Sequence, residues 1–377
     1  MDRVLEFSSS VPDFRRTTKG NIRHKLGDIL TLMILARLCG QTSRADIIEF
    51  GRFNLKRLRK MGILDNGVPS EPTFCRIEKG IDSSLMAEAQ RKFSDSFRSE
   101  LTVKGEPDII CMDGKALCGT VQENGRNPDI VSAFSSDAGI TLATEPCQEK
   151  SNEIKAMPIL IGKLDIAGHV VTADAMAMQK DIVDAIRKKD ANFMIELKAN
   201  QKALMYGVED RLGSAVPLQT FTDGPELDHG RIETRTYTVY DGLGLVADRS
   251  KWGEGLTVIV FESETIRKST GERTTEKRLY ISSLAPDAPY LGYIIRKHWS
   301  IESMHWQLDR NFLQDSIKRK HTQAARNLDT IQRIVHAVFS IWRGRRRKLA
   351  DKAKGIAELK RYISFGFTRL MRFLGQK

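Results

Sequence analysis

The sequence is poor in cysteine, and it has neither a long apolar run nor a leader-like start. The cysteines are odd in number, scattered and without a CxxC pair, which is typical of reduced packing thiols in a cytosolic protein. They are Cys39, Cys75, Cys111, Cys118 and Cys147. No apolar run reaches the roughly 18 residues that span a bilayer. The chain opens with acids and serines rather than a basic-then-apolar segment, so we expect no signal peptide, no membrane partner and a cytoplasmic location.

Positive charge is concentrated near the C-terminus. The formal net charge of the 377 residues is +12, yet residues 311–377 alone carry 17 Lys or Arg against 4 Asp or Glu. One run contains Arg343, Arg345, Arg346, Arg347 and Lys348. A basic block on an otherwise balanced chain predicts a polyanionic partner. Because no membrane segment is evident, nucleic acid is favoured over phospholipid.

Residues 1–105 have the pattern of short helices. Apolar residues recur at helical spacing from Leu26 to Leu38, and Ser43 followed by Asp46 indicates a capping box. Ser70 is the expected N-cap of a further helix in the segment PSEPTFCRI, with Thr73 and Arg76 on one face. Such helices suit a helix-turn-helix reader of DNA, although a plain helical bundle has the same pattern.

Strands and helices alternate over residues 106–200, and a β-rich segment follows. Expected strands are 109–113, 130–135, 139–144, 169–174 and 192–197, with helices at 152–164 and 177–189. This order is that of a ribonuclease-H-like core. The segment at about 216–285 has the Thr, Val, Ile and Tyr content of strands, at 232–240, 256–262 and 277–283, and is interpreted as a β insertion. Helices are expected again at 287–310, 321–342 and 355–373.

Two isolated acids follow apolar strand-like runs. Asp113 comes after Ile109–Met112 and Asp174 after Val170–Ala173, as when a buried parallel strand delivers a carboxylate to the active edge of an α/β sheet. Either residue alone is as well explained as a turn cap. Together with Glu302, they predict a three-carboxylate cluster of the kind that holds a pair of Mg²⁺ ions for phosphodiester chemistry.

Glu302 lies in the segment HWSIESMHWQLD, which is rich in His and Trp. On a helix, His298 and His305 could share its face, so a zinc hydrolase is an alternative. The spacing is not the His-Glu-x-x-His signature, and Trp299 and Trp306 favour a packed helix. The histidines are therefore expected beside bound phosphate or as groups that orient Glu302.

Long and unusual motifs over almost the whole chain resemble the bacterial insertion-sequence transposases of the DDE type, in the branch that contains the H-repeat-associated proteins. They include PSEPTFCRI, MDGKAL, VSAFSSDAGI, EKSNEIKAMPIL, TADAMAMQKDI, LKANQ, HGRIETR, RLYISSL and HWSIESMHWQLD. The resemblance places the family's acidic triad on Asp113, Asp174 and Glu302. It implies cleavage of transposon ends and their joining to target DNA with two Mg²⁺ or Mn²⁺ ions per active site, a homodimer on double-stranded DNA, and a nucleoid-associated location.

Flanking positions depart from the wider group. That group has the pattern Tyr-x2-Arg-x3-Glu-x6-Lys around the last acid. In this chain the Tyr, Arg and Lys positions are occupied by Ile295, His298 and Asp309, and Cys118 stands where the branch usually has Arg. An intact triad favours an enzyme. A degenerate relic that only binds DNA, and a structure-selective endonuclease on the same core, are the alternatives.

The predicted organisation has three parts. Residues 1–105 form a helical DNA-binding domain, 106–310 a ribonuclease-H-like core with the β insertion, and 311–377 a basic helical region. The residues expected to contact DNA come from all three parts. They are Thr73, Arg76, Lys115, Arg231, Arg235, His298, His305, Arg343, Arg345, Arg346 and Arg347.

Overall fold

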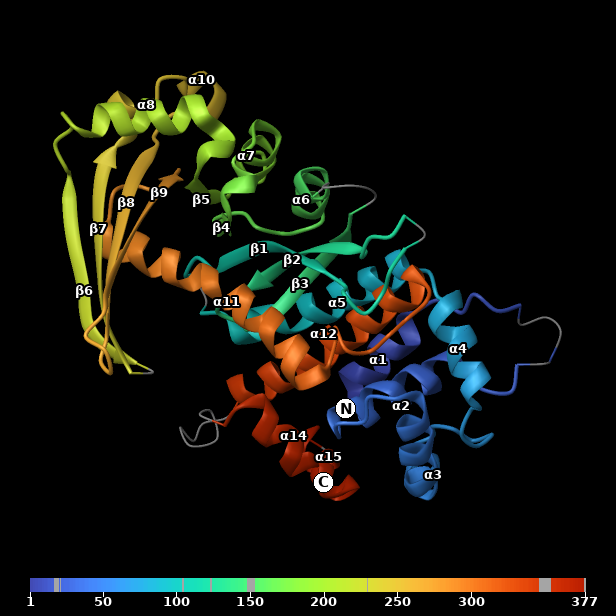
Figure 1. The fold of residues 1–377 in the computed structure, drawn as a ribbon. Coiled ribbons are helices and arrows are strands. Elements are labelled where there is room, and N and C mark those ends of the chain that lie inside the picture. Colours follow the sequence, from blue (N-terminus) through green and yellow to red (C-terminus); the bar gives the residue numbers. More distant parts are fainter. Residues whose placement is uncertain are drawn as a thin grey trace. The chain divides into compact units, whose positions relative to one another are not determined.

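A computed structural model describes residues 1–16, 20, 22–103, 105–122, 124–147, 153–228, 230–345 and 354–375. The fold is mixed α/β, with a large mixed sheet and a helical N-terminal region (Figure 1). By its contacts the chain divides into two compact units. The first comprises Met1–Glu106, Gly114–Cys147 and Glu302–Lys377, and the second Pro107–Asp113 and Gln148–Ile301.

The first unit is mainly helical. Its N-terminal helices are α1 Asp2–Ser10, α2 Leu26–Leu38, α3 Arg44–Lys60, α4 Glu71–Gly80 and α5 Ser83–Leu101. Its C-terminal helices are α12 Thr322–Gly344, α14 Ile356–Ser364 and α15 Phe367–Phe373. The antiparallel strands β2 Asp129–Ser135 and β3 Ile140–Pro146 complete it. The predicted helix at Leu26–Leu38 and the capping box between Ser43 and Asp46 are confirmed.

Helices α5 and α12 pack against each other and against β3. From α5, Gln90 Nε2 and Ser94 Oγ each donate a hydrogen bond of 2.7 Å to the carbonyl oxygen of Thr141. From α12, the buried Arg333 donates to both oxygens of Asp329, at 2.9 Å each. The core of this unit therefore contains paired polar groups as well as apolar side chains, which is how buried polar atoms keep their hydrogen bonds.

The second unit is built around strands. It holds β4 Val170–Ala173, β5 Asn192–Leu197, β6 Gln219–Asp228, β7 Arg231–Asp241, β8 Thr257–Arg267 and β9 Arg273–Ser282. Its helices are α6 Glu153–Gly162, η2 Ala175–Ala177, α7 Lys180–Arg187, η3 Ala199–Gln201, α8 Lys202–Leu212, α9 Gly242–Leu245 and α10 Arg249–Trp252. Strand β1 Ile109–Ala116 and helix α11 Ala288–Phe312 each have residues in both units.

Strand order in the sheet is β3-β2-β1-β4-β5-β9-β8-β7-β6. The pairs β1–β4 and β4–β5 are parallel, whereas β5–β9, β9–β8, β8–β7 and β7–β6 are antiparallel. The strands of the expected β insertion thus extend one sheet, because β9 pairs with β5. Gly292 of α11 packs against Tyr237 of β7 so closely that a Cβ there would lie 2.9 Å from the ring.

Several expected boundaries were wrong. Strand β1 does not end at Asp113 but continues to Ala116, and only Ile109–Met112 pair with β4. Strand β6 was not predicted; its side chains are mostly exposed. The helix expected at 355–373 is two helices, α14 and α15. Among the described residues no helix is long and apolar enough to cross a bilayer.

A buried carboxylate holds α4 in place within the first unit. Glu78 is 2% exposed and accepts hydrogen bonds from Arg44 Nη2 at 2.6 Å, while Arg319 Nε lies 3.1 Å from the same carboxylate oxygen. Beside it, the buried Arg37 has its pKa lowered to about 10, chiefly by burial. One carboxylate thus compensates several guanidinium groups in a site that water barely reaches.

We predict that Glu78→Gln lowers the free energy of unfolding by about 3–5 kcal/mol, because it leaves buried guanidinium charges without their counter-ion. Denaturant unfolding of the purified protein measures this. The matched control is Glu88→Gln on α5, where the half-exposed pair with Arg91 should contribute at most about 1 kcal/mol. A Glu78→Gln variant as stable as that control would contradict the prediction.

Candidate active site

Asp113 and Asp174 lie at the same end of the ladder that joins β1 and β4, Asp113 within β1 and Asp174 directly after β4. In the parallel ladder of β1 and β4, Met112 is the Cα partner of Ala173, and the two acids are the next residues along each chain. Asp174 also caps the short helix η2, since its carboxylate accepts a hydrogen bond of 3.2 Å from the Met176 amide. The apolar residues before each acid are buried in the sheet, which fixes where both carboxylates emerge.

The electrostatics of the pair disfavour two bare negative charges. Burial is the main cause that raises the pKa of Asp174, and the neighbouring charge of Asp113 raises it further. Lys198 acts in the opposite direction, but its ammonium is 2.9 Å from Glu196 and so is already shared. A bound cation would relieve both the burial and the repulsion, because an opposite charge within a few ångströms favours the ionised carboxylate.

Helix α11 contacts the same end of β1 and β4. Thr172 Oγ1 lies 2.9 Å from His298 Nδ1, and Cys111 Sγ donates to the carbonyl oxygen of Lys297 at 3.4 Å. Cys111 and Thr172 are partners in the ladder, so they face the same side of the sheet. Because strand side chains alternate with period two, Asp113 faces that side as well.

His298 is therefore a neighbour of the acidic pair. Burial is the main cause that lowers its pKa, Asp113 raises it and Arg278 lowers it again. The net shift is downward, which favours the uncharged imidazole. A neutral ring adds no positive charge to compete with a cation for the two carboxylates.

Glu302 lies on α11, one helical turn after His298, with an exposed side chain. Within the described part of the chain, no group of three or more His, Cys, Asp or Glu side chains is close enough together to hold a metal ion. The strand register brings Asp113 and Asp174 together within the second unit, whereas Glu302 belongs to the first unit.

The residues expected to read DNA on α4 share a face. Arg76 Nη2 donates to Thr73 Oγ1 at 3.3 Å and is exposed, whereas Phe74 and Ile77 are buried. Ser70 occupies the N-cap position, as expected, but its hydroxyl contacts Thr73 Oγ1 at 3.2 Å and caps no backbone amide. The exposed face of α4 is thus polar and the opposite face belongs to the core.

Other expected DNA contacts are engaged within the protein. Lys115 Nζ donates to Asp309 at 2.8 Å, and its side chain is 9% exposed. Arg235 is 6% exposed and donates to Glu226 at 2.9 Å and to Glu233. Both cations are held by carboxylates in this structure, whereas Arg231 at the start of β7 is exposed.

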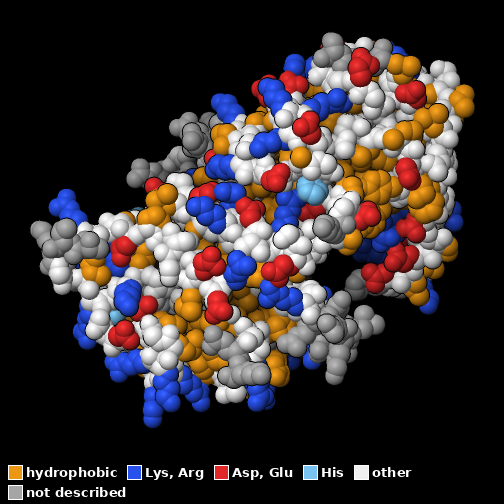
Figure 2. Space-filling view, turned by 180° about the vertical axis from the view of Figure 1, so that it is seen from behind, with side chains coloured by type: hydrophobic (Ala, Val, Ile, Leu, Met, Phe, Trp, Pro, Cys, Tyr) orange, Lys and Arg blue, Asp and Glu red, His pale blue; other side chains and the backbone are white. Residues whose placement is uncertain are grey.

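The remaining expected contacts differ in exposure. His305 is half-buried on α11 and Arg343 is half-buried on α12. Arg345 is exposed and paired with Glu100. Arg346 and Arg347 lie outside the described residues. On the face shown in Figure 2, basic and acidic side chains are interspersed, so charge alone does not mark a DNA-binding surface there.

Sequence reasoning missed Thr172 as a partner of the site. The signal was present in VVTAD, since Thr172 precedes Asp174 by two positions and strand periodicity turns both to one side. A lone threonine in an apolar strand gave no reason to expect a bond to a histidine 126 residues away.

Comparison with known proteins gives consistent matches. The family model described as "Transposase DDE domain" matches residues 105–336, and the one described as "DDE_Tnp_1-associated" matches residues 5–94. The chain is 33% identical over 344 residues to YncI of Escherichia coli O157:H7, named as a candidate transposase, covering 88% of this chain and 85% of that protein. It is 31% identical over 371 residues to YhhI of Escherichia coli strain K12, named as a candidate H repeat-associated transposase, covering 94% and 95%.

A solved structure is also similar. It is the cryo-EM structure of a piggyBac transposase synaptic complex with hairpin DNA, with 11% identity over 99% of this chain and 77% of that chain. The TM-score of 0.47 is too low to establish a common fold.

We predict that Asp174→Asn raises the melting temperature in metal-free buffer at neutral pH. Because the pKa of Asp174 is raised in the folded protein, its stabilising contribution is present when the carboxyl is protonated and is lost as the pH rises through that pKa. The amide removes the buried charge, so the gain should shrink as the pH falls towards the usual aspartate value of about 3.9. Thermal unfolding at several pH values measures it.

The matched control is Asp181→Asn, an exposed acid in the first turn of α7, which should bring no gain. A melting temperature of Asp174→Asn that stays at or below that of the wild type across this pH range would mean that the pair is not under electrostatic strain.

Proposed function

Because the chain belongs to the family of DDE transposases, we propose that it cleaves the ends of an insertion sequence and joins them to target DNA. The observation that carries the proposal is the register of β1 and β4, which brings Asp113 and Asp174 to one end of the sheet as a mutually repelling pair. We further propose that residues 106–310 are a ribonuclease-H-like core, flanked by a DNA-binding domain at 1–105 and a basic region at 311–377.

We propose that Asp113 and Asp174, together with Glu302, hold two divalent metal ions. The donors suit the group, since hard Mg²⁺ or Mn²⁺ prefers carboxylate oxygens, and the raised pKa of Asp174 marks a place where a cation is favourable. When bound, such ions supply an activated nucleophile and stabilise the charge that develops on the phosphate. For Glu302 to act as the third ligand, its side chain on α11 must point towards Asp113 and Asp174.

The chain's own groups prepare this site. The strand ladder fixes the two aspartates, and the Met176 amide holds Asp174 through a hydrogen bond. The hydrogen bond with Thr172 holds His298, and with it the turn of α11 that precedes Glu302. Because its lowered pKa favours the uncharged form, His298 adds no positive charge that would compete with a cation for the two carboxylates.

Contacts to double-stranded DNA are proposed for three places. The exposed face of α4, with Thr73 and Arg76, would read the element's ends, and the basic run after Arg343 would contact the backbone. Arg231 on β7 is a further candidate. The proposed assembly is a homodimer on DNA, in a cytoplasmic, nucleoid-associated protein.

We predict that Asp113→Asn and Asp174→Asn each abolish cleavage of a DNA fragment that carries the gene with its flanking sequences. A neutral amide cannot anchor Mg²⁺ as a carboxylate does, and the loss of one ligand disturbs both ions. The assay uses purified protein with Mg²⁺, Mn²⁺ or Zn²⁺, and only the first two should support activity. Asp181→Asn is the matched control and should cleave like the wild type.

Wild-type cleavage by Asp174→Asn would refute the assignment of that residue. Stoichiometric zinc in the purified protein, lost in His298→Ala and His305→Ala together with activity, would instead favour the zinc hydrolase. A wild-type protein that binds end DNA but does not cleave it with any of these metals would support the relic.

Specific recognition of the ends provides a separate prediction for Arg76. An arginine that bridges two acceptors on guanine discriminates by about 1–3 kcal/mol, so Arg76→Ala should weaken binding to end DNA by about 5-fold to 150-fold. Binding to scrambled duplex at the same salt concentration should change little. Fluorescence anisotropy with both duplexes measures the two affinities.

Lys79→Ala on the same helix is the control, because an exposed lysine that contacts phosphate weakens binding to both duplexes alike. Equal losses in Arg76→Ala would make Arg76 a backbone contact and move the search for specificity to Arg231.

A further inference from the structure

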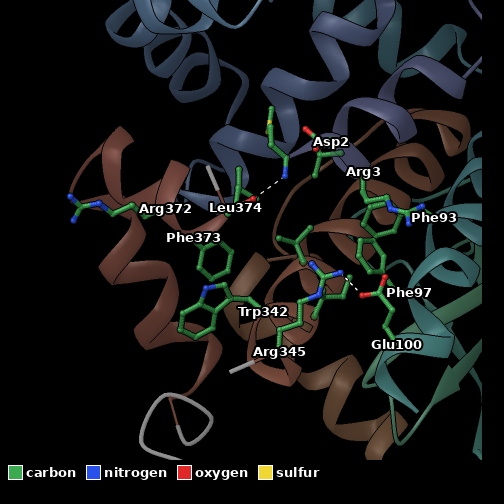
Figure 3. Close-up of a pocket in the computed structure, with 15 residues that line it drawn as sticks. Asp2, Arg3, Phe93, Phe97, Glu100, Trp342, Arg345, Arg372, Phe373 and Leu374 are labelled. Carbon is green, nitrogen blue, oxygen red and sulfur yellow. Dashed lines mark hydrogen bonds and ion pairs between the residues drawn. The ribbon is translucent and has the colours of Figure 1, made fainter. Parts of the chain in front are cut away.

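A cavity of about 500 Å³ lies within the first unit, away from the acidic pair in sequence and built from α1, α5, α12 and the end of α15 (Figure 3). Its apolar wall includes Phe93, Phe97 and Ile341. Trp342 and Phe373 stack on each other with ring centroids 5.1 Å apart and planes at 22°. A volume of this size accommodates a ligand of a few hundred daltons, and aromatic walls suit a planar one.

Cationic side chains border this cavity. The guanidinium carbons of Arg345 and Arg3 lie 5.0 and 5.4 Å from the centroid of the same ring, Phe97. Arg345 is also paired with Glu100, and a dashed line joins the two side chains in Figure 3. The two side chains of the pair are 53% and 43% exposed, so the pair contributes little and is readily exchanged for another anion.

We propose that this cavity binds a single unpaired nucleotide, with its base against Trp342 and its phosphate at Arg345. The inference rests on the proposed function, in which strand cleavage leaves DNA with unpaired residues. A nucleotide combines the two features that the cavity offers, a planar face for the aromatic wall and a negative charge for the guanidinium groups.

The basic sequence that follows Arg345 favours a DNA strand over an isolated small molecule as the ligand. Arg345 is followed directly by Arg346, Arg347 and Lys348. Each further nucleotide of a strand adds a phosphate that positive charge attracts, so a strand should bind more tightly than a mononucleotide. A paired base in a continuous duplex cannot enter, because its planar faces are already stacked.

The test measures binding without metal, so it is independent of cleavage and is carried out in the Asp174→Asn background. Labelled single-stranded oligonucleotide, the same strand made abasic at each position, blunt duplex and deoxyadenosine monophosphate as competitor are compared by anisotropy at one salt concentration. Base stacking is worth about 1–3 kcal/mol, so Trp342→Leu should bind the single strand about 5-fold to 150-fold more weakly and the duplex unchanged.

Further comparisons distinguish binding in the cavity from binding by charge alone. The abasic strand should bind the unaltered cavity as weakly as the normal strand binds Trp342→Leu, and this arm requires no cavity variant to fold. Arg345→Gln should weaken the single strand and the mononucleotide alike. The matched control is Tyr362→Leu, an exposed aromatic residue of α14 outside the cavity, which should bind all ligands normally.

Equal binding of the abasic and normal strands, or an unchanged affinity of folded Trp342→Leu, would overturn the proposal. Displacement by the mononucleotide with no preference for the single strand would assign the cavity to free nucleotides rather than DNA. If the wild-type protein does not cleave DNA but these binding results hold, the proposed function is refuted and the nucleotide site in the cavity is still supported.

Discussion

The parallel pairing of β1 with β4 is the constraint on which the proposed site depends. It sets Met112 opposite Ala173, so that the next residue of each chain segment is an acid at the same end of the β1–β4 ladder. The cost of that arrangement appears in the raised pKa of Asp174, which burial and Asp113 both cause. A protein that keeps two carboxylates in such a place gains most from a cation between them.

Helix α11 connects this pair with the rest of the protein. On its N-terminal side of Glu302, His298 is held by Thr172 of β4. On its C-terminal side, Gln307 Oε1 lies 2.9 Å from Nε2 of the buried His336 on α12, and Asp309 accepts from Lys115. Glu302 thus lies on a helix that is anchored on both sides, although its own side chain is exposed.

Much of the architecture was predictable because local patterns and tertiary packing agree. The apolar run Leu26–Leu38 became a helix buried nearly all round, and strand β5 matched its expected range of 192–197. Strand β6 was missed because it is an exposed edge strand that contains Gly224 and Pro225 and carries no apolar alternation. The strand end at Asp113 was misplaced because β1 continues beyond its partner β4. The burial of Arg235 depends on Glu226 and Glu233, a contact across β6 and β7 that no local pattern encodes.

We propose that Asp113 and Asp174 form a divalent-cation site. The direct test is to measure the melting temperature of the metal-free protein at increasing Mn²⁺ concentrations. A ligand that binds only the folded state raises that temperature. We expect a concentration-dependent rise in the wild type and in Asp181→Asn, and none in Asp113→Asn or Asp174→Asn. An equal rise in all four proteins would contradict it.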